Sequence, residues 1–131
     1  MFGVKIMINV SLGEIINAFP FLNKISNNSF VGKDAFKIGR LVREITKEYE
    51  LFEKSRKEII EQYAERDSEN NIIIEDNNVK IPLHLRDECN TKLEELLNER
   101  VDVNIEKLSF DILNNIEFTP IEALSAEVFF E

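Results

Sequence analysis

Residues 33–67 read KDAFKIGRLVREITKEYELFEKSRKEIIEQYAERD, a long run without a proline. On a helical wheel at about 100° per residue, its apolar side chains fall within a sector of roughly 120°. These side chains are Ile38, Leu41, Val42, Ile45, Tyr49, Phe52, Ile59, Ile60 and Tyr63. The pattern predicts one amphipathic helix over Lys33–Asp67, whose apolar stripe the rest of the chain covers. At 1.5 Å per residue the helix is about 50 Å long, so we expect one end to project or to pack on a partner.

The opposite side of this expected helix is basic in its first half. Its cations are Lys33, Lys37, Arg40, Arg43 and Lys47. Phe36 and Leu51 interrupt this polar side, and they either meet other parts of the chain or mark a contact surface. The basic face lacks a recognised nucleic-acid motif and interleaved exposed aromatic residues. We favour a solvated or intrachain-paired face, with a protein-binding patch at Lys37, Arg40, Arg43 and Lys47 as the alternative.

The N-terminal residues predict a strand followed by a short helix. Apolar and other residues alternate over 4–10, the period of a half-buried strand. Ser11 and Glu14 have the spacing of a capping box, in which each side chain binds the other residue's backbone N–H. Pro20 should kink or end the helix that follows. Residues 23–33 are expected to form a loop.

After the long helix, residues 72–75 and 79–81 are expected to form a β-hairpin across an Asp/Asn turn. Pro82 then opens a helix that runs to about Glu99 and carries one apolar stripe. This second helix is the expected antiparallel partner for the end of the long helix. Its stripe includes Cys89, which we interpret as a small buried hydrophobe.

The C-terminal residues predict further short elements. Alternation over 101–105 indicates a strand, and 116–118 is a candidate for a brief one. Thr119 and Glu122 form a second capping box, with Pro120 at the first position of a short closing helix. The sequence therefore predicts a single α+β domain over residues 1–131. In it, the long amphipathic helix packs with a second helix through a β-hairpin, with short strands and terminal helices added.

The charge of the chain is uneven. Its net charge is −9, yet residues 33–67 hold nine basic and nine acidic side chains. Residues 68–131 hold five basic and fifteen acidic side chains, a net charge of −10. Such a half repels nucleic acid and anionic membranes, and its ordinary role is solubility. The alternative is a surface that imitates nucleic acid, for which the candidates are Glu94, Glu95, Glu99, Asp102 and Glu106.

No residue set identifies a reaction. Cys89 is the only cysteine and His84 the only histidine, which excludes a disulfide framework and a histidine-based triad or metal site within one chain. We therefore expect no enzyme, cofactor or metal, although a carboxylate-dependent metal enzyme stays an alternative. The N-terminal residues lack the features of a signal peptide, and no apolar run reaches the ~20 residues that span a bilayer. We expect a cytoplasmic protein.

The order of elements resembles a family of small tailed-phage and prophage proteins with a long charged helix and an acidic C-terminal half. The segments that carry the resemblance are the Gly32-Lys33 turn into the long helix, EIIEQYAERD (58–67), LEELLNERVDVNIEKL (93–108) and IEFTPIEALSAEVF (116–129). The family has no assigned activity, so the resemblance implies only a phage or prophage protein that acts inside a bacterial cell.

These observations favour a non-enzymatic phage or prophage protein that binds another protein, in an assembly or accessory role. The partner is expected to be a phage or host protein or a second copy of the chain, as a homo-oligomer, and nucleic acid is not an expected ligand. The alternative function is an acidic inhibitor of a host nucleic-acid-binding or defence enzyme.

Overall fold

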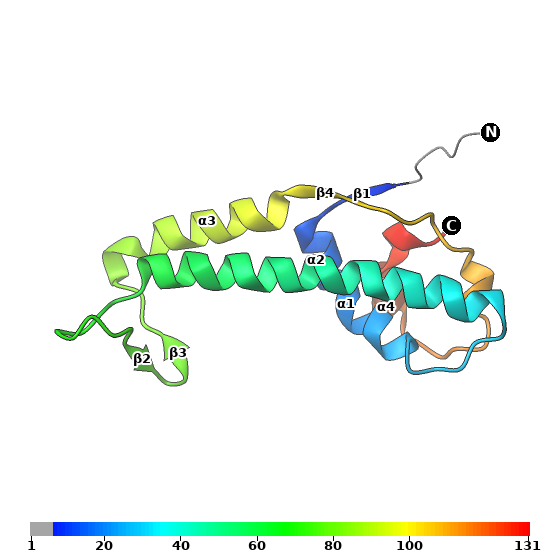
Figure 1. Ribbon diagram of the computed structural model, residues 1–131, viewed down its shortest axis with the longest axis horizontal. Helices are drawn as coiled ribbons and strands as arrows, with labels where there is room; N and C mark the ends of the chain where they lie inside the picture. Colours follow the sequence, from blue (N-terminus) through cyan, green and yellow to red (C-terminus); the bar gives the residue numbers. More distant parts are fainter. Residues whose placement is uncertain (1–6) are drawn as a thin grey trace.

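The long helix α2 (Lys33–Tyr63) runs along the molecule, and the other elements are arranged along it (Figure 1). The computed structural model describes residues 7–131, so the expected strand residues Val4 and Ile6 lie outside the described residues. In chain order the other elements are β1 (Ile8–Ser11), α1 (Leu12–Ile25), β2 (Ile74–Glu75), β3 (Asn78–Val79), α3 (Arg86–Asn98), β4 (Arg100–Val103) and α4 (Pro120–Ser125). Short 3₁₀ turns lie at Leu83–Leu85, Phe110–Leu113 and Glu127–Phe129. The predicted α+β fold, a long helix packed with others and a small hairpin, is confirmed.

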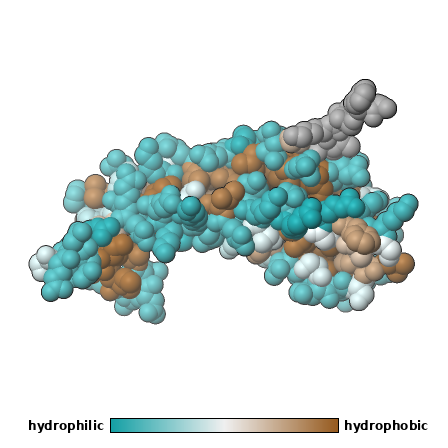
Figure 2. Space-filling model, viewed as in Figure 1, coloured by the Kyte–Doolittle hydropathy of each residue, from teal (hydrophilic) through white to brown (hydrophobic). Residues whose placement is uncertain are grey.

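The apolar stripe of α2 is covered as the sequence predicts. Ile38, Leu41, Ile45 and Phe52 are buried in the main hydrophobic cluster. Tyr49 is half-buried, and its ring stacks on that of Phe19 from α1 at 4.1 Å between centroids. The outward side of the helix forms part of a largely hydrophilic surface (Figure 2). The helix therefore attaches to the rest of the chain along one side only.

The predicted end of the long helix was wrong, because α2 stops at Tyr63 and not at Asp67. Ala64 turns to extended backbone, with ψ near 140°. The Glu65 N–H then donates to the Lys80 carbonyl at 2.8 Å, and the Glu65 carbonyl accepts from the Ile73 N–H at 2.9 Å. The Glu65 backbone therefore bonds with the hairpin and does not continue the helix. Because the bonded residues Ile73 and Lys80 lie outside the segment 64–67, the local sequence does not reveal this helix end.

Helix α1 begins as predicted and ends later than predicted. Ser11 and Glu14 form the complete capping box at its N-terminus. The helix continues past Pro20 to Ile25, so the expected loop starts later and Pro20 does not end the helix. Pro20 lies on the exposed side, where it removes one backbone hydrogen bond. Buried Phe21, Leu22 and Ile25 beyond it hold the last turns against the core.

Strands β1 and β4 join distant parts of the chain. They pair antiparallel, with Ile8 opposite Val103 and Val10 opposite Val101. Ile8, Val10 and Val103 are buried, while Asn9 and Asp102 point outward, as alternation predicts. The predicted strand over 101–105 is confirmed over 101–103, although β4 begins at Arg100 and ends before Asn104.

The second helix packs against α2 as expected. Strands β2 and β3 form the predicted hairpin, and Asp76 and Asn77 at its turn have φ of 50° and 64°. Asparagine and aspartate adopt this left-handed backbone more readily than most residues. Helix α3 then returns beside α2 with Cys89 and Leu96 buried (Figure 1). Cys89 is therefore a buried hydrophobe, as predicted.

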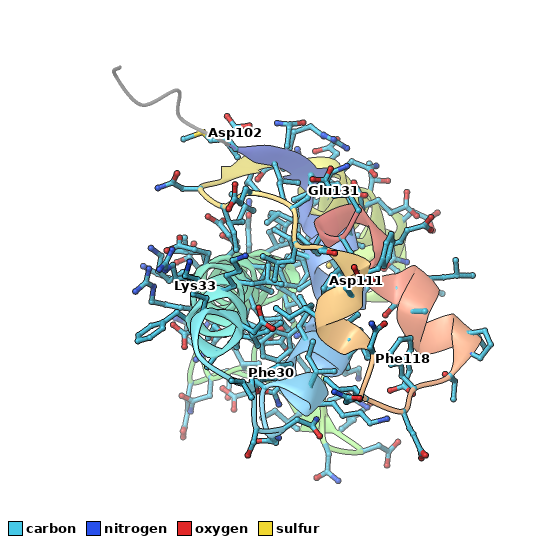
Figure 3. All side chains as sticks on the ribbon, turned by 90° about the vertical axis from the view of Figure 1, so that its right-hand side faces the viewer. Phe30, Lys33, Asp102, Asp111, Phe118 and Glu131 are labelled. Carbon is cyan, nitrogen blue, oxygen red and sulfur yellow. The ribbon has the colours of Figure 1, made fainter. Side chains whose placement is uncertain are left out.

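The C-terminal residues close the core. No strand forms at 116–118, so that expectation was wrong; the chain there is irregular after a 3₁₀ turn. Instead, the Leu108 N–H donates to the Phe129 carbonyl at 3.0 Å, and the Glu131 N–H donates to the Leu108 carbonyl at 2.8 Å. These bonds place the Phe129 ring in the core, where it is fully buried. Seen end-on, α1 lies between α2 and α4 (Figure 3).

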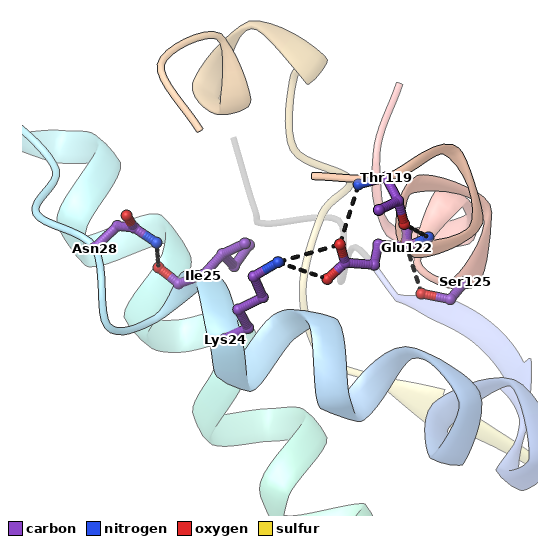
Figure 4. Close-up of polar contacts among 6 residues, drawn as sticks. All are labelled: Lys24, Ile25, Asn28, Thr119, Glu122 and Ser125. Carbon is purple, nitrogen blue, oxygen red and sulfur yellow. Dashed lines mark hydrogen bonds and ion pairs between the residues drawn. The ribbon is translucent and has the colours of Figure 1, made fainter. Parts of the chain in front are cut away.

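One ion pair connects α1 to α4 (Figure 4). The Lys24 ammonium donates to both carboxylate oxygens of Glu122, at 2.9 and 3.1 Å. Glu122 also accepts from the Thr119 N–H at 3.0 Å, which completes the predicted capping box of α4. The hydrogen bond from Lys24 and that from the Thr119 backbone lower the pKa of the Glu122 carboxyl. One side chain thus both begins a helix and fastens it to its neighbour.

Substituting Ile45→Asp or Leu96→Asp should unfold the protein, because each places a charge without a partner in the core. We expect a loss of about 3 kcal/mol or more in the free energy of unfolding, measured by thermal or urea denaturation. The control is Lys37→Glu with Arg43→Glu, two exposed positions, which should change it by less than about 0.5 kcal/mol. Melting of Ile45→Asp at the wild-type temperature would contradict the burial of this stripe.

Substituting Glu122→Gln should destabilise the protein at neutral pH and have little effect in acid. A lowered pKa in the folded state contributes stability above the ordinary carboxyl pKa, and this stability is lost as pH falls through the lowered value. Urea denaturation of both proteins at pH 7 and at about pH 3 checks this, since ordinary Glu titrates near 4.3. Lys24→Gln should produce the same pH-dependent difference. A difference that does not change with pH would be inconsistent with the proposed coupling.

Candidate functional site

The predicted basic residues form a stripe on the outward side of α2. We call Lys33, Lys37, Arg40, Arg43 and Lys47 the basic stripe. All five are exposed, on the side of the helix away from the buried residues Ile38, Leu41 and Ile45. Their helical spacing brings together cations that the sequence separates by three or four positions. The predicted set is therefore a continuous exposed surface.

Glu44 neutralises only part of the basic stripe. Its carboxylate lies 3.0 Å from the Lys47 ammonium and 3.5 Å from the Arg43 guanidinium. Lys37 and Arg40 form no ion pair with another described residue. The intrachain pairing that the sequence left open thus accounts for two cations of the stripe and leaves a net positive charge.

Two exposed apolar side chains lie on the same side of α2 as the stripe. Phe36 and Leu51 are 71% and 59% exposed, and neither packs into the hydrophobic core. Phe36, Arg40, Lys47 and Leu51 are separated by four, seven and four residues, which places them on one line along the helix. The open choice for Phe36 and Leu51 is therefore decided in favour of a free surface on this chain.

The acidic candidates lie on several elements. We call Glu94, Glu95, Glu99, Asp102 and Glu106 the acidic surface, and all five are exposed. They come from α3, from the residue that caps it, from β4 and from the segment that follows. Only Glu95 forms an ion pair with a described residue, to Lys92 at 3.6 Å. Asp102 accepts a hydrogen bond from the Asn9 amide at 2.8 Å.

Arg100 interrupts the acidic surface, a feature that the sequence analysis missed. Its guanidinium lies 3.2 Å from the Glu14 carboxylate and also donates to the side chain and backbone of Asn9. Arg100 thus ties β4 to β1 and to the start of α1. Its alternation with Asp102 on the outward side of β4 is visible in the sequence, but its partners depend on a strand pairing across the whole chain.

Other exposed apolar residues were also missed. Val31, Leu83, Ile121 and Leu124 are each more than two-thirds exposed. Ile121 and Leu124 lie in the closing helix, and α4 turns both to the outside. A six-residue helix offers too few turns for a reliable wheel, so the sequence could not place them.

A shallow cleft lies between the hairpin and the two long helices, with a volume of about 490 Å³. Ile60, Val79, Ile81, Cys89 and Leu93 supply its apolar lining. Burial raises the pKa of the Cys89 thiol, which keeps it protonated and unreactive at neutral pH. The cleft therefore offers a surface for contact without an activated nucleophile among these residues.

Groups with altered pKa values occur at structural contacts. Burial, with Glu88 nearby, raises the pKa of Tyr63 where α2 meets α3. Glu65 and Glu75 raise the pKa of Lys80 beside the hairpin. Among residues 7–131, no group of three or more His, Cys, Asp or Glu side chains is arranged to hold a metal ion. In the same part of the chain, no helix is both long and apolar enough to cross a membrane.

No protein-family model matches the sequence, and comparisons with curated proteins and with solved structures gave no significant match. The resemblance to tailed-phage and prophage proteins therefore stays a prediction.

Replacing Phe36 and Leu51 by glutamine should leave the fold intact. Both side chains are mostly in water, and glutamine is a good helix former. We expect the free energy of unfolding to change by less than about 0.5 kcal/mol per substitution in urea denaturation. The matched control is Phe129→Ala, a buried aromatic residue, which should cost about 3–5 kcal/mol. A large loss for Phe36→Gln would indicate a role in stability and not in recognition.

Proposed function

We propose that this is a non-enzymatic phage or prophage protein that acts by binding another protein, in an assembly or accessory role inside the bacterial cell. The observation that carries the proposal is the exposed line on α2, in which Arg40 and Lys47 of the basic stripe lie between Phe36 and Leu51. Large apolar side chains beside arginine are typical of protein interfaces, whose cores are enriched in aromatic residues and arginine.

Stability offers no reason for these residue choices. An exposed Phe36 adds nothing to the core, and Lys37 and Arg40 have no ion-pair partner in the described part of the chain. Polar residues would satisfy the helix equally well at these positions. A partner that covers the stripe would bury Phe36 and Leu51 and pair the free cations.

The distribution of titratable groups supports binding over catalysis. Catalytic sites usually bring together groups whose pKa values are shifted to suit the reaction. The shifted groups described here each have a structural cause: Glu122 at the α1–α4 contact, Lys80 beside the hairpin, and Tyr63 and Cys89 between α2 and α3.

The second candidate is an acidic inhibitor of a host nucleic-acid-binding or defence enzyme. The observation in its favour is that all five carboxylates of the acidic surface are exposed, and four of them have no ion-pair partner among residues 7–131. A basic cleft on an enzyme would attract such a surface. Arg100 weakens the imitation, because it places a cation within the series.

Affinity capture with the tagged protein from bacterial lysates, with and without phage infection, tests both candidates. We expect a stoichiometric protein complex that is lost with Phe36→Gln and Arg40→Glu together. Arg56→Glu with Lys57→Glu, farther along α2, is the control and should retain it.

The identity of the captured protein separates the candidates. A nucleic-acid enzyme whose capture is abolished by Glu94→Lys with Glu99→Lys, and not by the stripe variant, would favour the inhibitor. If no protein is captured in stoichiometric amount under either condition, and the protein does not associate with itself, the binding proposal is wrong.

A further inference from the structure

The chain carries two exposed surfaces of opposite charge that do not contact each other. The basic stripe lies on the first half of α2, while the acidic surface lies on α3, β4 and the segment after it. No ion pair among residues 7–131 joins the two, since the stripe pairs only with Glu44 and the acidic surface only with Lys92. Lys33 and Asp102 lie on different sides of the molecule in the end-on view (Figure 3).

The two surfaces are opposite in charge. Residues 33–47 hold five basic and two acidic side chains, whereas residues 92–107 hold five acidic and three basic side chains within a C-terminal half of net charge −10. One copy cannot neutralise its own stripe in this fold, because the two surfaces lie apart. A second copy of the chain, always present at the same concentration as the first, supplies negative charge that could pair with the stripe.

We propose that the basic stripe, with Phe36 and Leu51, docks on the acidic surface of a second copy of the chain. This inference deepens the proposed protein-binding function by naming the partner. The apolar pair adds a contribution that salt does not screen, since docking removes both side chains from water. At 1.5 Å per residue, Phe36 and Leu51 are about 22 Å apart, so the interface spans four turns of α2.

The pattern along α2 favours a protein over a nucleic acid as occupant. A phosphate backbone that followed the helix beyond Leu51 would meet Glu58 and Glu61 on the same side. It would also meet the net negative charge of the C-terminal half. The Leu51 side chain has no charge or hydrogen-bond donor with which to bind a phosphate. Apolar side chains beside charged ones are instead typical of protein interfaces.

The contact uses two different surfaces, and two assemblies are compatible with it. If both contacts form at once around a two-fold axis, the result is a closed dimer. Otherwise each copy leaves one stripe and one acidic surface free, and larger species follow.

Sedimentation or light scattering of the full chain at low and high salt provides the first test. We expect association at about 0.05 M salt that weakens at about 0.5 M, because exposed charges are screened at high ionic strength. The substitution pair Phe36→Gln with Leu51→Gln should weaken association under both conditions, with folding confirmed by circular dichroism.

A charge-reversal rescue is the decisive experiment. Lys37→Glu with Arg40→Glu makes the stripe acidic, and Glu94→Lys with Glu99→Lys makes the acidic surface basic. Each variant alone should associate at least about tenfold more weakly than the wild type. Mixed in equal amounts, the two variants should form a complex again, because each then offers a surface opposite in charge to the other's. Arg56→Glu with Lys57→Glu changes the net charge by the same amount and should associate normally.

This inference would be overturned by a wild-type protein that is monomeric at low salt, by association that survives both reversals, or by a mixture that forms no complex. Duplex DNA bound by the stripe would also overturn it. A monomer whose stripe still captures another protein would refute self-docking alone and leave the proposed function standing. A monomer that captures nothing would contradict both.

Discussion

The fold depends on covering one side of α2. Ile38, Leu41 and Ile45 meet α1 and the C-terminal segment, and each such side chain contributes about 1.5–3 kcal/mol when it leaves water. Farther along, the same side meets α3, so two separate groups of elements use a single continuous surface. Because this contact occupies only one side, the other side of a 31-residue helix stays exposed, and the proposed binding surface lies there.

Local chemistry made much of the fold predictable. The apolar period of α2, the two capping boxes and the Asp76-Asn77 turn each act within a few residues, so the sequence alone reveals them. The errors occurred where distant residues decide the outcome. Glu65 leaves the helix to bond Lys80 and Ile73, and Pro20 stays within α1 because buried residues beyond it anchor the last turns.

The candidate surfaces follow the same division. The excess of acidic residues in the C-terminal half is a matter of composition, and the outward direction of Arg40 follows from the period of its helix. Only the packed structure shows that Phe36 stays exposed, and that Asn9 and Glu14 hold Arg100 within an acidic series. Whether an apolar residue is exposed depends on which other elements pack against it, and a helical wheel contains no information about those elements.

The pairing of Ile8 with Val103 has a consequence for the order in which the protein is made. Residue 8 leaves the ribosome early, yet its strand has no partner until residue 103 has followed, and the Phe129 ring arrives later still. During that interval α1 and the first turns of α2 exist with their apolar sides uncovered. Non-local pairing slows closure and prolongs such exposure. A nascent chain of this design therefore exposes apolar surface until synthesis reaches the residues that cover it.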